Sequence, residues 1–210
     1  MRATLKRGCD ALAFLLVLPA FLLYQAARAI LGAERAFPGW SQAFSLVPGL
    51  IGVFLRRAFY RLVLARCGAD ACISFGTLIS HPTARLGRGV YVGPYCCLGG
   101  ITLEDDVILG SGVSVTNGAR QHGTGRLDIP IREQPGTWAS VRIGRDCWIG
   151  ERAVVMADIG EQCIVGAGSV VVHPLPSRAV AAGVPARILR YRDDAAAKEM
   201  SETAEPNFVS

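Results

Sequence analysis

An aliphatic residue recurs every six positions along much of this chain, and this period constrains the fold more than any other feature of the sequence. Leu, Ile and Val make up 53 of the 210 residues, so twelve matches in register are far beyond chance. A period of six is neither helical nor a simple alternation, but it fits a short strand and a corner repeated three times per turn of a triangular prism. The twelve positions, in four groups of three, are Leu86, Val92, Leu98; Leu103, Leu109, Val115; Ile143, Ile149, Val155; and Ile159, Val165, Val171.

The repeat also predicts what fills this prism. The aliphatic side chains point inward, where copies from successive coils bury one another, and small or β-branched residues four positions later fill the remaining interior. A glycine follows directly in eight of the twelve cases, as expected where a tight corner or a positive φ disfavours a Cβ atom. We expect four coils stacked about 4.8 Å apart, with residues 73–80 as an irregular cap. The pattern does not determine the hand of the coil.

The charge of the chain is concentrated at one end. The formal net charge is +5, but residues 1–70 hold nine Lys or Arg against three Asp or Glu, whereas the remaining 140 hold thirteen against fourteen. The basic third is also the apolar third and lacks interleaved polar residues, so a nucleic-acid partner gains little support. A membrane surface fits this combination better.

Two uncharged, apolar stretches occupy that third. Residues 11–27 follow a basic start, and residues 36–55 are interrupted by prolines and glycines and followed by four arginines. As one helix the first stretch measures about 25 Å, slightly less than the hydrocarbon core of a bilayer. A cleaved signal peptide, a membrane-crossing or re-entrant hairpin, and helices that cover a soluble trimer are the three alternatives. We prefer membrane attachment, spanning or dipping, since both Arg-rich flanks then lie on the cytoplasmic side, the second as an interfacial amphipathic helix.

The seven cysteines predict neither a disulfide framework nor a metal site. Their number is odd, no two form a CxxC pair, and no histidine lies at zinc-ligand spacing, so no metal is expected. Cys96, Cys147 and Cys163 share one phase of the repeat, where a small apolar residue is needed. Free buried thiols suit a reducing compartment.

Four segments of the chain resemble a known family: VGPYCCLGG, IGRDCWIGERAVV, IGEQCIVGAGSVVV and AAGVPARIL. They are similar to the hexapeptide-repeat acyltransferases, especially the maltose and galactoside O-acetyltransferases and their relatives in surface-polysaccharide synthesis. The resemblance covers about residues 73–190. It implies a mainly β fold, a single-stranded left-handed parallel β-helix, in a homotrimer that transfers acyl groups from coenzyme A at clefts between subunits. We expect the apolar N-terminal helices before it and a short C-terminal helix after it.

The repeat is interrupted once for some 25 residues, between Val115 and Val141, by a Gly-, Pro- and Arg-rich segment that reads as a loop leaving the prism. This loop contains His122. Acyl transfer from a thioester to a hydroxyl needs a base for the hydroxyl proton, and neutral imidazole has a suitable pKa. His122 also lies where the resembling enzymes carry their base, so we predict that it is catalytic. A solvated loop histidine is the alternative.

Further site residues follow from the resemblance. Trp148 matches a tryptophan that lines the acceptor and thioester site, although a simple outward-facing aromatic is an equal alternative. Apart from the resemblance, Asn117, Glu133 and Gln134 of the loop are predicted to contact the acceptor, with Glu133 able to orient the imidazole. A solvated loop charge is the alternative for Glu133. Cys97 leaves a covalent mechanism undecided. The asparagine that the sugar acetyltransferases use near the acceptor has no clear counterpart around residues 95–100, which leaves the acceptor open.

The resemblance also implies a coenzyme A site. The pantetheine arm is expected along the prism beside Ala167, Gly168 and Ser169. Arg187, in the final motif, is expected to meet the nucleotide phosphate, with assistance from Arg190. A basic segment that only closes the prism is the alternative for these two arginines.

Together these features predict a membrane-associating helical segment (1–70), a β-helix acyltransferase domain (71–190) with an extruded loop (116–140), and a flexible tail (191–210). The expected activity is acetyl-CoA-dependent O-acetylation of a sugar hydroxyl of a lipid-linked or surface polysaccharide precursor, by direct transfer with a His general base. The expected location is the cytoplasmic face of the inner (plasma) membrane. The alternatives are an acetyltransferase for a small soluble acceptor, such as an antibiotic or amino acid, and a non-catalytic β-helix scaffold at the membrane.

Overall fold

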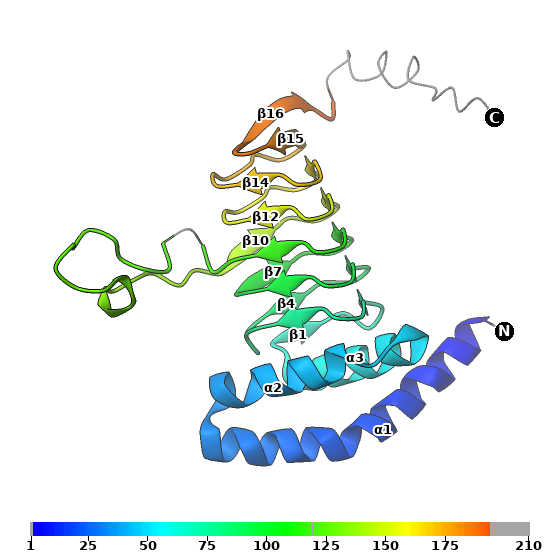
Figure 1. The fold of residues 1–210 in the computed structure, drawn as a ribbon. Coiled ribbons are helices and arrows are strands. Elements are labelled where there is room, and N and C mark those ends of the chain that lie inside the picture. The colour runs from blue at the N-terminus through cyan, green and yellow to red at the C-terminus, as the bar shows by residue number, and fades with distance from the viewer. Residues whose placement is uncertain (1, 119, 194–210) are drawn as a thin grey trace, which may run out of the picture.

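A computed structural model describes residues 2–118 and 120–193, with side chains from Gly8 onward. A β-helix stands on a base of three helices, and a long loop projects from its side (Figure 1). The helices are α1 (Arg2–Leu31), α2 (Ala33–Ser45) and α3 (Gly49–Val63). The predicted flexible tail lies outside the described residues from position 194 on.

The β-helix consists of three parallel sheets that form the faces of a prism. Sheet A contains β1 (Arg66–Cys67), β4 (Arg85–Leu86), β7 (Ile101–Leu103) and β10 (Val141–Ile143). Sheet B contains β2 (Cys72–Ile73), β5 (Tyr91–Val92), β8 (Ile108–Leu109), β11 (Trp148–Ile149), β13 (Ile164–Val165), β15 (Ala179–Gly183) and β16 (Ala186–Tyr191). Sheet C contains β3 (Leu78–Ile79), β6 (Cys97–Leu98), β9 (Ser114–Val115), β12 (Val154–Val155) and β14 (Val170–Val171).

The interior of the prism is what the repeat predicts. All twelve aliphatic positions are no more than 2% exposed. Eight residues four positions later are equally buried: Val90, Cys96, Val107, Val113, Cys147, Ala153, Cys163 and Ser169. Each aliphatic residue pairs with its counterpart one coil away, as Val92 does with Leu109 and Leu109 with Ile149. The core is therefore a stack of like side chains.

The corner glycines are needed because successive coils approach closely. A Cβ atom at Gly150 would lie 2.5 Å from the backbone nitrogen of Ala167 in the next coil. The positive φ occurs two positions later, at Arg152, with φ 55°. Close approach between coils, rather than a left-handed conformation at the glycine itself, thus explains the repeat's glycine.

The prism is longer than the four coils expected. Cys67, Ile73 and Ile79 form a regular first coil, so the expectation of an irregular cap over residues 73–80 is wrong. At the other end Leu175 and β15 begin a further coil above Ile159 and β13. Within the described residues this makes five complete coils and a partial sixth.

Within the described residues, the segment expected to form a short C-terminal helix is a strand instead. Residues Ala186–Tyr191 form β16, which runs back antiparallel along β15. The last coil leaves an unpaired sheet edge, and a hairpin pairs those backbone groups whereas a helix would not.

The three apolar helices are confirmed, but their arginines do not all face outward as an interfacial helix would require. Arg56 is fully buried between α3, the end of α2 and the first coil. Its Nε donates to the Ile73 carbonyl at 2.8 Å, and its Nη1 donates to the carbonyls of Phe44 at 3.2 Å and Val47 at 2.6 Å. Burial lowers the pKa of Arg56. This side chain joins the helical base to the β-helix.

Replacing Arg56 by methionine is expected to destabilise the protein by about 2–4 kcal/mol, because three carbonyls, one buried and two partly buried, lose a charged donor. The measurement is chemical denaturation in mild detergent, followed by circular dichroism. Arg35→Met, at an exposed position of α2, is the matched control and should shift stability by no more than about 0.5 kcal/mol. Equal stability of the two variants would contradict the joining role of Arg56.

Candidate active site at the interrupted coil

The long loop leaves the prism at the corner between sheets C and A, after β9, and returns to β10 (Figure 1). Its two limbs are tied together near the prism. The amide of Ala139 donates to the Asn117 carbonyl at 3.0 Å, and the amide of Thr137 donates to the Arg120 carbonyl at 2.7 Å. The Asn117 side chain accepts a hydrogen bond from the Gly100 amide, so it anchors the loop to the preceding coil. We call residues 116–118, 120–123 and 135–140 the stem of the loop.

His122 lies in this stem rather than at the loop tip. A Cβ atom at Gly136 would lie 2.7 Å from the His122 nitrogen and 1.9 Å from the Gln121 carbonyl oxygen, so only glycine lets the limbs approach here. The exposed His122 ring meets the edge of Trp138 on the opposite limb, with ring centroids 6.0 Å apart at 78°. Trp138 is itself 61% exposed. The stem thus presents an imidazole and an indole side by side.

Trp138 was not predicted from the sequence. The available clue was a tryptophan in a Gly-, Pro- and Arg-rich loop, a place where large aromatic residues need a partner or a ligand. Its pairing with His122 depends on the register of the two limbs, which no sequence pattern specifies.

The loop tip is organised by Gln134. Its buried amide accepts from the Arg126 nitrogen at 3.0 Å and donates to the carbonyls of Arg126 at 2.7 Å and Ile129 at 3.2 Å. Glu133 lies beside it in the short 3₁₀ helix Ile131–Glu133, with its carboxylate 3.6 Å from the Arg132 side chain. To contact an acceptor, Gln134 would have to leave its bonds within the loop, and Glu133 faces Arg132 rather than His122. Their acceptor roles stay predictions.

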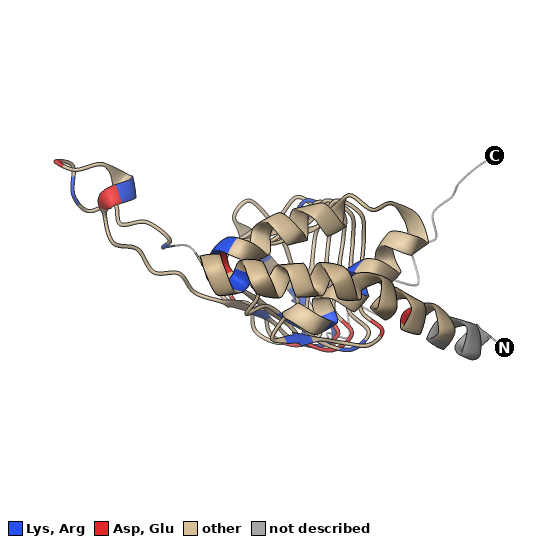
Figure 2. Cartoon of the chain, turned by 90° about the horizontal axis from the view of Figure 1, so that it is seen from below, with Lys and Arg blue, Asp and Glu red and all other residues tan. Residues whose placement is uncertain are grey.

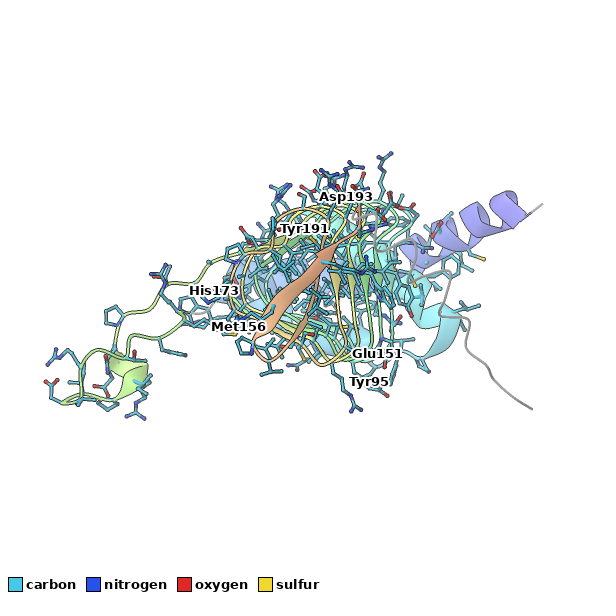
Figure 3. All side chains as sticks on the ribbon, turned by 90° about the horizontal axis from the view of Figure 1, so that it is seen from above. Tyr95, Glu151, Met156, His173, Tyr191 and Asp193 are labelled. Atoms are coloured by element: carbon cyan, nitrogen blue, oxygen red, sulfur yellow. The ribbon has the colours of Figure 1, made fainter. Side chains whose placement is uncertain are left out.

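A pocket of about 410 Å³ lies beside the stem, at the same corner of the next two coils. Arg120 and Thr137 of the stem line it, together with Met156, Asp158 and Pro174 from the prism. Viewed along the prism axis, Met156 and His173 lie at the corner from which the loop leaves (Figure 3). Asp158 accepts a hydrogen bond from the Arg142 amide at 2.8 Å. This is a polar-rimmed hollow next to the histidine stem.

The residues expected to bind coenzyme A lie elsewhere on the prism. Ala167 and Gly168 form an exposed turn at the corner between sheets B and C. The Ser169 side chain is buried and accepts a hydrogen bond from the Gly183 amide at 3.1 Å, so its hydroxyl holds two coils together. Arg187 and Arg190 are exposed on β16, where their side chains donate to the carbonyls of Ala186 and Tyr191.

Trp148 lies on the outer face of sheet B, where it is 54% exposed. It stands between Ile108 and Ile164 in neighbouring strands, and Tyr91 continues the row. One outer face of the prism is therefore apolar, unlike the solvated face of an ordinary sheet.

The predicted site residues thus form two groups that a single chain does not bring together. His122 and Asn117 are at the corner between sheets C and A, whereas Ala167 and Gly168 are at the corner between sheets B and C. Figure 3 shows this separation: Met156 and His173 lie beside the loop, and Tyr95 and Glu151 mark the other corner. Sheet C lies between them.

The cysteines of the prism are ordinary core residues where they point inward. Cys96 is buried, its Sγ donates to the Gly110 carbonyl at 3.2 Å, and burial raises its pKa to about 11. A thiol in that state is a poor nucleophile at neutral pH. Cys97 is exposed. Over residues 2–118 and 120–193 no group of three or more His, Cys, Asp or Glu is placed to hold a metal ion.

Comparison with known proteins identifies the repeat. The hexapeptide repeat of succinyl-transferase matches residues 84–117 and 140–172, on either side of the loop. The serine acetyltransferase of Haemophilus influenzae is 33% identical over 118 residues, which cover 56% of this chain and 40% of that protein. The chain thus spans less than half the length of this curated relative.

Solved structures share the fold. A maltose O-acetyltransferase from Clostridium difficile 630 superposes with a TM-score of 0.67 at 18% identity, covering 77% of this chain and 87% of that one. AntD, an N-acyltransferase from Bacillus cereus in complex with dTDP and 3-hydroxybutyryl-CoA, superposes with a TM-score of 0.52 at 19% identity, covering 70% and 93%. Through its hexapeptide repeats and its β-helix, the chain is similar to the hexapeptide-repeat acyltransferases and shares their fold.

Proposed function

We propose that the protein is an acetyl-CoA-dependent O-acetyltransferase that acts on a sugar hydroxyl of a lipid-linked or surface polysaccharide precursor, at the cytoplasmic face of the inner (plasma) membrane. The observation that carries this proposal is the long break in an otherwise regular prism, whose stem presents an exposed imidazole beside an exposed indole. A scaffold needs no such break, so the non-catalytic alternative is less favoured.

His122 acts as the general base in this proposal. Its neutral imidazole takes the proton of the acceptor hydroxyl while the hydroxyl oxygen attacks the thioester carbonyl. The tetrahedral intermediate then collapses as the C–S bond breaks, and the leaving coenzyme A thiolate takes the hydroxyl proton from the imidazolium. The acetyl group passes directly to the acceptor, with no covalent enzyme intermediate.

The reaction is placed between subunits of a homotrimer, because the two groups of predicted residues lie at different corners of one chain. The stem of one subunit would meet the coenzyme A corner of its neighbour. The apolar outer face of sheet B, with exposed Tyr91, Ile108 and Trp148, supports an assembly that covers it. Arg187 and Arg190 would pair with the phosphates of the donor.

The remaining alternatives for the function differ in the acceptor that receives the acetyl group. The relatives named serine acetyltransferase favour a small soluble acceptor. The exposed apolar face of α1 instead supports an acceptor at a membrane, because a soluble enzyme has no need of it.

The acceptor is tested by incubating the purified protein and radiolabelled acetyl-CoA with membrane glycolipid extract, with L-serine and with free oligosaccharides. We expect label in the glycolipid fraction that mild alkali releases as acetate, as an O-ester requires. Heat-inactivated protein is the control for chemical transfer. Label confined to serine or to free oligosaccharides would contradict the glycolipid acceptor, and no label anywhere would favour the scaffold alternative.

A further inference from the structure

The helix α1 is apolar on both of its faces, but only one of them is covered by the rest of the chain. Ala13, Val17 and Tyr24 are buried against α2 and α3. The opposite face carries large aliphatic side chains at helical spacing, all of them between 53% and 82% exposed: Leu12, Leu15, Leu16, Leu22, Leu23, Ile30 and Leu31. A surface helix of a soluble protein carries polar residues there.

The exposed apolar surface continues onto the neighbouring helix. Leu50 and Ile51 in the first turns of α3 are 76% and 71% exposed. Between α1 and α3 runs a groove of about 310 Å³ lined entirely by apolar residues and Cys9, among them Leu12, Leu16 and Phe54. We call this surface, formed by the outer face of α1 and the start of α3, the base of the molecule.

The base faces away from the β-helix, and α1 lies across it rather than along the prism axis (Figure 1). Between Asp10 and Arg28 the helix α1 carries no charged residue, and seen from below arginines lie where α1 meets α2, beside the acidic Glu34 (Figure 2). Arg28 in the last turn of α1 and Arg35 near the start of α2 are the residues at that junction, and both are exposed. Asp10, the one acidic residue of α1, is paired with Arg57.

Residues Gly8–Leu31 are long and apolar enough to cross a membrane. The contacts of α1 oppose a crossing. The Tyr24 ring packs edge-on against Phe37, Trp40 and Phe59, with centroid distances of 6.0–6.5 Å. To span, α1 would have to leave these rings and separate Asp10 from Arg57, carrying a carboxylate toward the hydrocarbon.

We infer that the base binds flat on a lipid bilayer, with α1 in the plane of the membrane interface and the β-helix axis along the membrane normal. The uncharged aliphatic face enters the acyl boundary, and Arg28 and Arg35 meet lipid phosphates at its edge. A second copy of the chain is a weaker candidate for covering the base, because two such bases face to face would bring their basic edges together. Arg61, stacked 4.8 Å from the Phe14 ring centre, adds to the positive charge of this region.

This orientation sets the height of the candidate active site. The loop leaves after the third coil, about 10 Å above the first at roughly 4.8 Å per coil, and the helical layers below add about 8–10 Å each. Figure 1 shows the loop running level with the coils, not down toward the helices. If the proposed function holds, His122 works roughly 30 Å above the interface, and the acylated sugar is one held away from its lipid by further sugars.

Flotation with vesicles tests the binding without any chemistry. We expect the full-length protein to float with phosphatidylcholine vesicles and more strongly when phosphatidylglycerol is included. Leu15→Asp combined with Leu22→Asp should lower the partition coefficient at least tenfold, because the bilayer loses two leucine side chains and meets two carboxylates instead. Leu127→Asp, a 99% exposed leucine at the loop tip, is the matched control and should float like the wild type.

Depth measurements distinguish lying from spanning. With Cys9 and Cys97 replaced by serine, nitroxide labels at Leu15→Cys, Leu22→Cys and Ile30→Cys should report equal depths in the bilayer. A spanning α1 would instead give depths that differ by about 1.5 Å per residue, which would overturn the inference. The inference would also be overturned if the protein did not bind vesicles and sedimentation showed that it self-associates through the base. Neither readout depends on acetyl transfer. A failure of the membrane inference can therefore be distinguished from a failure of the proposed enzymatic function.

Discussion

Replacing His122 by alanine is expected to lower the rate of acetyl transfer by about 10²- to 10⁴-fold, the usual contribution of a general base. The loss should appear in kcat, because the imidazole acts on the proton that moves during the attack and contributes little to holding either substrate. The fold should be unchanged, since the ring is exposed and lies against the Trp138 ring at the surface of the stem. The measurement compares initial rates at saturating acetyl-CoA, with circular dichroism as the test of folding.

His173→Ala is the matched control for this experiment. His173 is also exposed and lies at the same corner of the prism, next to the pocket beside the stem (Figure 3). It is outside the loop and follows the regular repeat, so we expect nearly wild-type rates. Wild-type rates for the His122 variant would remove it from the mechanism, and a large loss for His173→Ala alone would transfer the role of base to the prism.

The prism was predictable because its order is local and repeated. Each aliphatic residue contacts its counterpart in the next coil. A shift in register would disrupt this contact in every coil, so the sequence pattern is strict. The first coil escaped prediction because Cys67 stands in an aliphatic position and the corner after Ile73 begins with Ser74 instead of glycine. The C-terminal strand was not predicted because it forms by pairing with the open edge of the last coil, and no local sequence pattern indicates that pairing.

The candidate site was only half predictable. His122 follows from the place where the repeat breaks, and its neighbour Trp138 follows from the approach of two limbs at Gly136, fourteen residues further along the chain. The buried role of Arg56 was not predictable either, because its three carbonyl partners come from α2, the turn after it and β2. Contacts between segments distant in sequence leave no periodic trace, so these residues read as an ordinary loop tryptophan and a surface arginine.

Mixing two inactive variants is expected to restore activity if the site is shared between subunits. His122→Ala removes the base but keeps the donor-binding strand. Arg187→Glu combined with Arg190→Glu keeps the base but reverses the charge of β16, which should raise the KM for acetyl-CoA more than tenfold through the loss of two charge-assisted contacts. At low acetyl-CoA each variant alone should be nearly inactive.

Co-expressed with different affinity tags, the two variants should form mixed trimers. In a ring of heterologous contacts with equal, random mixing, about one interface in four joins an intact stem to an intact β16, so activity should return to about a quarter of the wild-type value. Mixing the variants after purification, without subunit exchange, is the control and should stay inactive. Mixed trimers as inactive as either parent would show that the stem and β16 do not serve one site. Since sheet C separates the two groups within a chain, that result would remove the donor role from β16 and leave the pocket beside the stem as the place to seek coenzyme A.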